Sequence, residues 1–297
     1  MHTDGSATAI MSRPQPQPAP RPIPLSGQFA VGVQLDWHFA SLSQGELGLL
    51  CLLGGGIRSA QVYWLGEIVP FFRAEGGWYA LLAAGMETLP RQVPLVARAQ
   101  LETGAATFAR RVRIMPGMFL REEFTLQGAA AGLVDADIEA AEMAAIAEMT
   151  ARTSSAPLWD AAGFALPLPS AFASPFGSFR AMNASLRTRH TGWDQHAATG
   201  TPVRAMAAGR VAFAGQLAIR GSYALIDHGL GLYTGYAHFS ALQVQAGQTV
   251  AAGQVIGLSG NTGRSSAPHL HWELRWRGRW VNGLALLEMW LPQTDSG

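Results

Sequence analysis

The residue types best suited to catalysis occur in two short clusters that lie far apart in the chain. The first is His190-Thr-Gly-Trp-Asp194, with the pattern HxGxD, and the second is His269-Leu-His271, with the pattern HxH. Side chains at even offsets along a strand point to the same face, so the two members of each cluster can converge. Two imidazoles and one carboxylate give three protein ligands and leave a fourth position for water, as in catalytic zinc sites. Together the clusters predict a zinc site that supports hydrolysis.

Neither cluster is specific alone, because histidines two residues apart on a strand are usually surface or hydrogen-bonded residues. A third segment, Gly235-Tyr-Ala-His238, adds another histidine, and four of the eight histidines in the chain fall inside these three motifs. Chance is a poor explanation for that concentration. His196 and His228 lie nearby, and we expect them to be turn or hydrogen-bonded residues rather than ligands.

In this order, the motifs resemble those of the lysostaphin/LytM-type zinc metallopeptidases, a peptidoglycan endopeptidase family. The likeness spans residues 170–285 and includes further segments of the same pattern: Phe176-Gly-Ser-Phe-Arg180, Gly200-Thr-Pro-Val203, the stretch 247–256 and the stretch 260–273. The resemblance implies that His190, Asp194 and His271 hold one Zn²⁺ per chain. It also implies that His269 and His238 provide acid/base catalysis for a zinc-activated water, without deciding which is the principal base.

The activity that this resemblance implies is hydrolysis of peptide cross-links in bacterial peptidoglycan, with stem peptides as substrates, in the cell envelope (periplasmic or secreted). Branches that cut glycine bridges carry a Tyr shortly before HxGxD. Residues 181–189 contain none, which favours cross-links between stem peptides. Two alternatives stay open: a non-catalytic wall-binding or amidase-activating family member, and an envelope protein in which zinc only staples the fold.

Two further residues are candidates for supporting the site. From His269 to Arg275 polar and apolar residues alternate strictly, which predicts a strand and places Glu273 on the metal side. Glu273 then either hydrogen-bonds a zinc-binding histidine or pairs with an arginine. Members of the family are often held latent by an upstream segment, and here Asn183 or the loop 150–169 is the candidate. An envelope regulatory partner would fit such latency.

Composition limits the other functional classes. The net charge is +1 and every basic residue is Arg, so the chain shows no basic patch typical of nucleic-acid binding. The longest apolar run, 47–57, is too short to predict a transmembrane segment. Cys51 is the only cysteine, which excludes an internal disulfide.

The chain as a whole is predicted to be mainly β and to have four parts. They are a disordered Pro-rich tail (1–25), an immunoglobulin-like β-sandwich with a positioning or regulatory role (26–130), a helix and linker (131–169) and an antiparallel β zinc-peptidase domain of the duplicated hybrid motif type (170–290). Asp135 is predicted to cap the linker helix, which ends at Met149. Alternating residues from Phe29 to Trp37 predict one half-buried strand. The first twelve residues lack the features of a secretory signal, whereas the Pro-rich stretch is typical of a tether after a leader or anchor.

Overall fold

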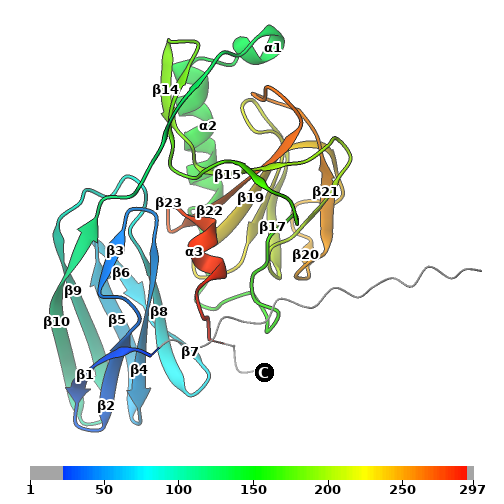
Figure 1. Ribbon diagram of the computed structural model, residues 1–297. Coiled ribbons are helices and arrows are strands. Elements are labelled where there is room, and N and C mark those ends of the chain that lie inside the picture. The colour runs from blue at the N-terminus through cyan, green and yellow to red at the C-terminus, as the bar shows by residue number, and fades with distance from the viewer. Residues whose placement is uncertain (1–22, 293–297) are drawn as a thin grey trace, which may run out of the picture.

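The computed structural model describes residues 23–292, and it consists mainly of β-strands, as predicted. Most of the predicted Pro-rich tail therefore lies outside the described residues. Figure 1 shows a two-sheet body formed by the N-terminal half and a second β-body, with helices, formed by the C-terminal half. None of the helices within 23–292 has the length and apolar character needed to cross a bilayer.

The N-terminal body is a β-sandwich of two five-stranded sheets. One sheet contains, in spatial order, β1 (Leu25–Ala30), β2 (Val33–Trp37), β4 (Leu47–Gly54), β8 (Gly77–Ala83) and β7 (Phe72–Ala74). The other contains β3 (Ser41–Ser43), β10 (Gly104–Met115), β9 (Gln92–Leu101), β5 (Ile57–Trp64) and β6 (Glu67–Pro70). Both sheets contribute fully buried side chains to one core, and the Trp64 indole N–H crosses between them to donate to the Ala83 carbonyl (2.7 Å).

The single strand predicted from Phe29 to Trp37 is wrong: the chain folds there into a hairpin. β1 ends at Ala30 and β2 begins at Val33, and the two strands pair with each other. Gly32 has a φ of +73°, which a residue without a side chain adopts easily, and Val31 at the turn is 94% exposed. Alternation alone cannot reveal this turn, because a two-residue connection leaves the period unchanged.

The C-terminal body is built on one large, mostly antiparallel sheet. Its main path is β12 (Phe172–Ser174), β15 (Gly192–His196), β22 (His269–Trp276), β19 (Leu232–Leu242), β18 (Gly221–Asp227), β17 (Gly209–Leu217) and β20 (Thr249–Val250). Three strands lie off this path: β16 (Pro202–Arg204), β21 (Val255–Ser259) and β23 (Arg279–Val281). The predicted alternation of β22 is confirmed, since Leu270, Trp272 and Leu274 are fully buried.

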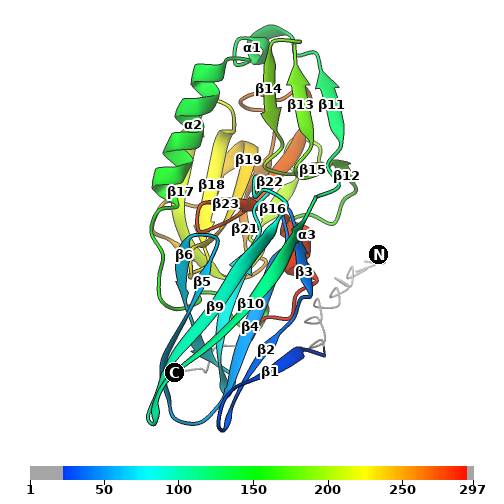
Figure 2. The same ribbon diagram turned by 90° about the vertical axis from the view of Figure 1, so that its left-hand side faces the viewer.

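A small third sheet and the helices complete the C-terminal body. The sheet contains β11 (Arg121–Phe124), β13 (Phe179–Met182) and β14 (Leu186–Arg189), and the helices are α1 (Gly128–Ala131), α2 (Ala136–Met149) and α3 (Gly283–Leu287). β11 falls inside the range predicted for the sandwich, yet it pairs with β13. The Asp135 carboxylate accepts the N–H groups of Asp137 and Ile138, so the predicted helix cap is present. Figure 2 shows α2 running beside the large sheet, with the small sheet beyond it.

Candidate metal centre

Strand pairing brings the two sequence clusters together at the centre of the large sheet. In the β15–β22 ladder Asp194 lies directly opposite His271. Gly192 of the HxGxD motif is required for this close pairing, because a Cβ there would lie 2.1 Å from the Trp272 carbonyl oxygen. His190 precedes β15 and is held by backbone hydrogen bonds to Ser178 and Gly177.

The side chains of His190, Asp194 and His271 form a triangle of ligand atoms. His190 Nε2 lies 3.1 Å from Asp194 Oδ1 and 3.0 Å from His271 Nδ1, and the third side is 2.9 Å. Ligands of a tetrahedral zinc at about 2.0–2.1 Å lie about 3.3 Å apart, so a triangle of this size fits such an ion. These three residues form the group within 23–292 that could hold a metal ion, and all three are buried.

The hydrogen-bond partners on the far edges of the rings leave one nitrogen of each histidine facing the triangle. His190 Nδ1 donates to the Pro175 carbonyl (2.8 Å), which leaves Nε2 as a lone pair. His271 Nε2 contacts Glu273 (3.2 Å), so Nδ1 is the nitrogen that faces Asp194 and His190. Two imidazole nitrogens and a carboxylate oxygen therefore converge on one point, and a cation at that point would satisfy all three.

Burial and neighbouring charges set the protonation of these groups. Burial lowers the pKa of His190 to about 4, despite the opposing pull of Asp194, so this imidazole is neutral near pH 7. Burial also opposes ionisation of Asp194, but the histidines and Arg180 outweigh it and hold the pKa of this carboxyl well below its ordinary value. Burial lowers the pKa of His271 too, but Asp194 and Glu273 outweigh it and raise this pKa above its ordinary value, so a metal ion would take the place of a proton on this imidazole.

Arg180 of β13 holds the second oxygen of Asp194. Its Nη2 donates to Asp194 Oδ2 (2.7 Å) and to Ser174 Oγ (2.7 Å), while Nε donates to Glu122 of β11 (3.3 Å). One carboxylate oxygen thus faces the histidines and the other is occupied, which would limit Asp194 to one bond with a metal ion. Through Arg180, the small sheet therefore contacts the metal centre.

Glu273 contacts both a histidine of the triangle and an arginine. Its Oε2 lies 3.2 Å from His271 Nε2, and both of its oxygens accept hydrogen bonds from the buried Arg220. Thr191 and Tyr223 donate to it as well. Burial opposes its ionisation, but Arg220 and His271 hold the pKa of Glu273 well below its ordinary value, so it is a carboxylate. It fixes the ring orientation and tautomer of His271, as carboxylates commonly do for metal-binding histidines.

His238 and His269 stand beside the triangle with their outer nitrogens engaged. His238 Nδ1 contacts the Thr262 carbonyl (2.7 Å) and His269 Nδ1 contacts the Ala267 carbonyl (2.8 Å), so Nε2 of each is the free atom. Their ring centres are 4.7 Å apart, and His269 Nε2 lies 3.6 Å from Asp194 Oδ1. Burial, reinforced by His269 and His271, holds the pKa of His238 well below its ordinary value.

A β-bulge positions His238. β19 pairs with β22 as far as Ala237 and with β21 from Phe239 onward, so the strand changes partners at this residue. His238 has a φ of +63°, a conformation that costs a residue with a side chain roughly 1–2 kcal/mol. Bulges and strained residues of this kind cluster at functional sites.

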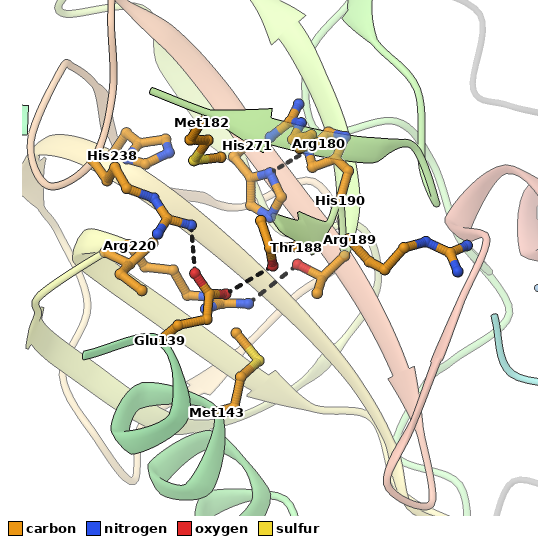
Figure 3. Close-up of a pocket in the computed structure, with 13 residues that line it drawn as sticks. Glu139, Met143, Arg180, Met182, Thr188, Arg189, His190, Arg220, His238 and His271 are labelled. Atoms are coloured by element: carbon orange, nitrogen blue, oxygen red, sulfur yellow. Dashed lines mark hydrogen bonds and ion pairs between the residues drawn. The ribbon is translucent and has the colours of Figure 1, made fainter. Parts of the chain in front are cut away.

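A pocket opens onto the metal centre, and α2 forms part of its wall. Figure 3 shows Glu139 and Met143 of α2 facing the side of the pocket that carries His271. Glu139 forms an ion pair with Arg264 (2.7 Å) and accepts a hydrogen bond from Thr188 (3.2 Å), and both of these partners also line the pocket. Asn183 is not among the lining residues; it exchanges hydrogen bonds with the backbone of Leu126 instead.

Several residues around the centre were not predicted as functional from the sequence. Arg180 ends the motif Phe176-Gly-Ser-Phe-Arg180, and a charged residue in an otherwise uncharged motif is a usable signal. Arg220 and the glutamates of α2 offer no such signal, because they meet the centre only through the fold.

Known proteins resemble this region in sequence and most of the chain in fold. Residues 188–283 match peptidase family M23. A DD-carboxypeptidase/endopeptidase of Neisseria meningitidis, Mpg, is 47% identical over 127 residues, which is 41% of this chain and 29% of that protein. The peptidoglycan DD-endopeptidase ShyA of Vibrio cholerae is 46% identical over 95 residues, which is 32% of this chain and 22% of that protein.

The chain thus spans less than a third of the length of these relatives. A solved Pseudomonas aeruginosa structure named for peptidase M23 covers 84% of this chain and 96% of its own, with a TM-score of 0.60 and 23% identity. That likeness shows a shared fold. The sequence match and the converging ligand atoms agree on the same stretch: residues 188–283 are similar to peptidase family M23.

Proposed function

We propose that this protein is a zinc-dependent endopeptidase that hydrolyses peptide cross-links of bacterial peptidoglycan. The observation that carries the proposal is the triangle of ligand atoms from His190, Asp194 and His271, with the Nε2 atoms of two further histidines beside it. The names of the relatives Mpg and ShyA support a substrate in the wall. Such a substrate would place the protein in the bacterial envelope, periplasmic or secreted.

Zinc bound at this triangle would supply a nucleophilic water at neutral pH and a Lewis acid for the scissile carbonyl. The protein residues then have separate tasks. His269 is the more exposed of the two free imidazoles, and we assign to it the transfer of a proton from water to the leaving amine. The buried His238 stays neutral and accepts a hydrogen bond through Nε2, which orients the attacking water.

Mass analysis of muropeptides released from purified walls tests this proposal. The full chain with Zn²⁺ should convert cross-linked dimers into monomers by cleaving a peptide bond, and a chelator should stop the reaction. His269→Ala should release about 10²–10⁴-fold less product. Wall binding without any released muropeptide would instead support a non-catalytic wall-binding or amidase-activating protein.

A further inference from the structure

Helix α2 buries a glutamate against the peptidase region. Glu142 and Ile146 are its two buried residues, and Glu142 is 5% exposed. The Glu142 carboxylate accepts the backbone N–H groups of Ile219 (2.6 Å) and Arg220 (3.1 Å), and also Arg220 Nη1 (2.9 Å). A helix that needed only to cover the sheet would present an apolar side chain here, because burying a carboxylate is costly without such partners.

The Arg220 guanidinium joins this carboxylate to the one behind His271. Nε and Nη2 donate to the two oxygens of Glu273, both at 2.7 Å, while Nη1 turns to Glu142. Arg220 is 3% exposed and Glu273 is 1% exposed. The guanidinium is planar and rigid, so its N–H groups point in fixed directions. It can bind the carboxylates of Glu142 and Glu273 at the same time only if both stay in their present positions.

The charges along this chain of contacts meet at Glu273. Two carboxylates, Glu142 and Glu273, contact the single guanidinium of Arg220, and the buried Arg275 adds a second positive charge near Glu273. Glu273 Oε2 faces His271 Nε2, on the edge of the ring opposite Nδ1. A carboxylate in this position makes the far nitrogen a stronger ligand for a cation.

We propose that Glu142 is a positioning residue for the metal centre, acting through Arg220 and Glu273 on His271. The assignment rests on the proposed function, since it takes His271 to be a zinc ligand. Glu142 lies in the linker helix α2, outside residues 188–283. The region that matches the family therefore lacks one residue that supports the metal centre. Loss of Glu142 frees Arg220 to draw Glu273 away from His271, which weakens metal binding.

The affinity of the full chain for Zn²⁺, measured by competition with a chromophoric chelator at pH 7, tests this assignment. Glu273→Gln should bind Zn²⁺ roughly 10–100-fold more weakly than the unaltered protein, and Glu142→Gln roughly 3–10-fold more weakly. Glu148→Gln is the matched control, because Glu148 is an exposed residue of the same helix, and it should bind Zn²⁺ normally.

A double-mutant cycle distinguishes positioning from a general loss of structure. In the Glu273→Gln background, Glu142→Gln should cause no further loss of Zn²⁺ affinity, because its effect passes through Glu273. Additive losses, or a Glu142→Gln protein that binds Zn²⁺ normally, would overturn the assignment. If Glu142→Gln does not fold, Glu142→Asp replaces it in the same cycle with the same two outcomes. Failure of the unaltered protein to bind Zn²⁺ would refute the proposed function itself.

Discussion

Each ligand atom of the proposed centre is prepared by a residue on its outer side. The Pro175 carbonyl accepts a hydrogen bond from His190 Nδ1, and Arg180 donates to one oxygen of Asp194. Glu273 contacts His271 Nε2, on the outer edge of that ring. The three inner atoms then face one another at 2.9–3.1 Å. Burial lowers the pKa of His271, but Asp194 and Glu273 outweigh it and raise it, so the centre of the triangle favours a positive charge, which suits these side chains to metal binding.

His271 and His269 lie on one strand, but their different positions predict different effects of each substitution on zinc content. His271→Ala should lose most of its bound zinc, because one side of the ligand triangle disappears. His269→Ala should keep its zinc and lose about 10²–10⁴-fold in turnover, because its Nε2 lies beside the triangle and is not one of its corners. Metal analysis of the purified proteins checks both, with thermal unfolding as a control for folding. Full zinc content in His271→Ala would contradict its assignment as a ligand.

The sequence yields the candidate ligands more readily than their supports. Ligands occur in short motifs whose spacing follows from strand geometry, so local pattern is sufficient to propose them. Arg220 and Glu142 are 78 residues apart and become partners only when α2 packs on the sheet. A buried charge of this kind looks like a surface charge in the sequence, because its burial depends on a distant partner.

At the scale of elements, alternation predicts strands well and irregularities poorly. β22 follows its alternating pattern from end to end, because one side faces the core and the other the metal centre. The hairpin turn at Val31 and the bulge at His238 leave little trace in the pattern, since each changes the backbone direction without changing the residue types. The bulge matters more for function, because it turns His238 toward His269.

His228, at the end of β18, makes the stability of this region sensitive to acid. It is fully buried, its nitrogens are bonded to the Ala208 carbonyl and the Thr234 hydroxyl, and burial lowers its pKa to about 4 from the ordinary 6.5. Between these pH values the unfolded chain binds a proton that the folded chain does not, so stability is fully present above pH 6.5 and falls toward pH 4. The lost contribution amounts to roughly 3 kcal/mol at most.

The variant His228→Gln should therefore be less stable at pH 7 and less sensitive to acid than the unaltered protein. Denaturant unfolding of both proteins at pH 7, 6, 5 and 4.5 measures the difference, with a chelator present so that metal release does not contribute. The gap between the two unfolding free energies should narrow as the pH falls. A gap that stays constant over this range would show that His228 does not titrate on unfolding.

At the scale of the whole molecule, the sandwich and the peptidase region share a core. The largest cluster of buried apolar residues includes Leu232, Leu274 and Trp276 of the large sheet together with residues of both sandwich sheets. Arg279 and Arg277 of the C-terminal body also pair with Glu67 of the sandwich. The sequence predicts the existence of both parts, but their joint core depends on residues far apart in the chain and cannot be derived from local pattern.

Two shortened chains separate the contribution of the sandwich from that of α2. A chain that begins at Pro116 loses the sandwich but keeps α2, whereas one that begins at Pro169 loses both. Both should unfold at a lower temperature than the full chain, because exposing each large side chain of the shared core costs about 1.5–3 kcal/mol. Only the second should also bind Zn²⁺ more weakly, because it lacks Glu142 and also Glu122, the partner of Arg180. Thermal unfolding measures the first effect. Chelator competition measures the second, at a temperature below the melting temperature of the least stable chain. Equal Zn²⁺ affinity in both shortened chains would mean that α2 covers the site without supporting it.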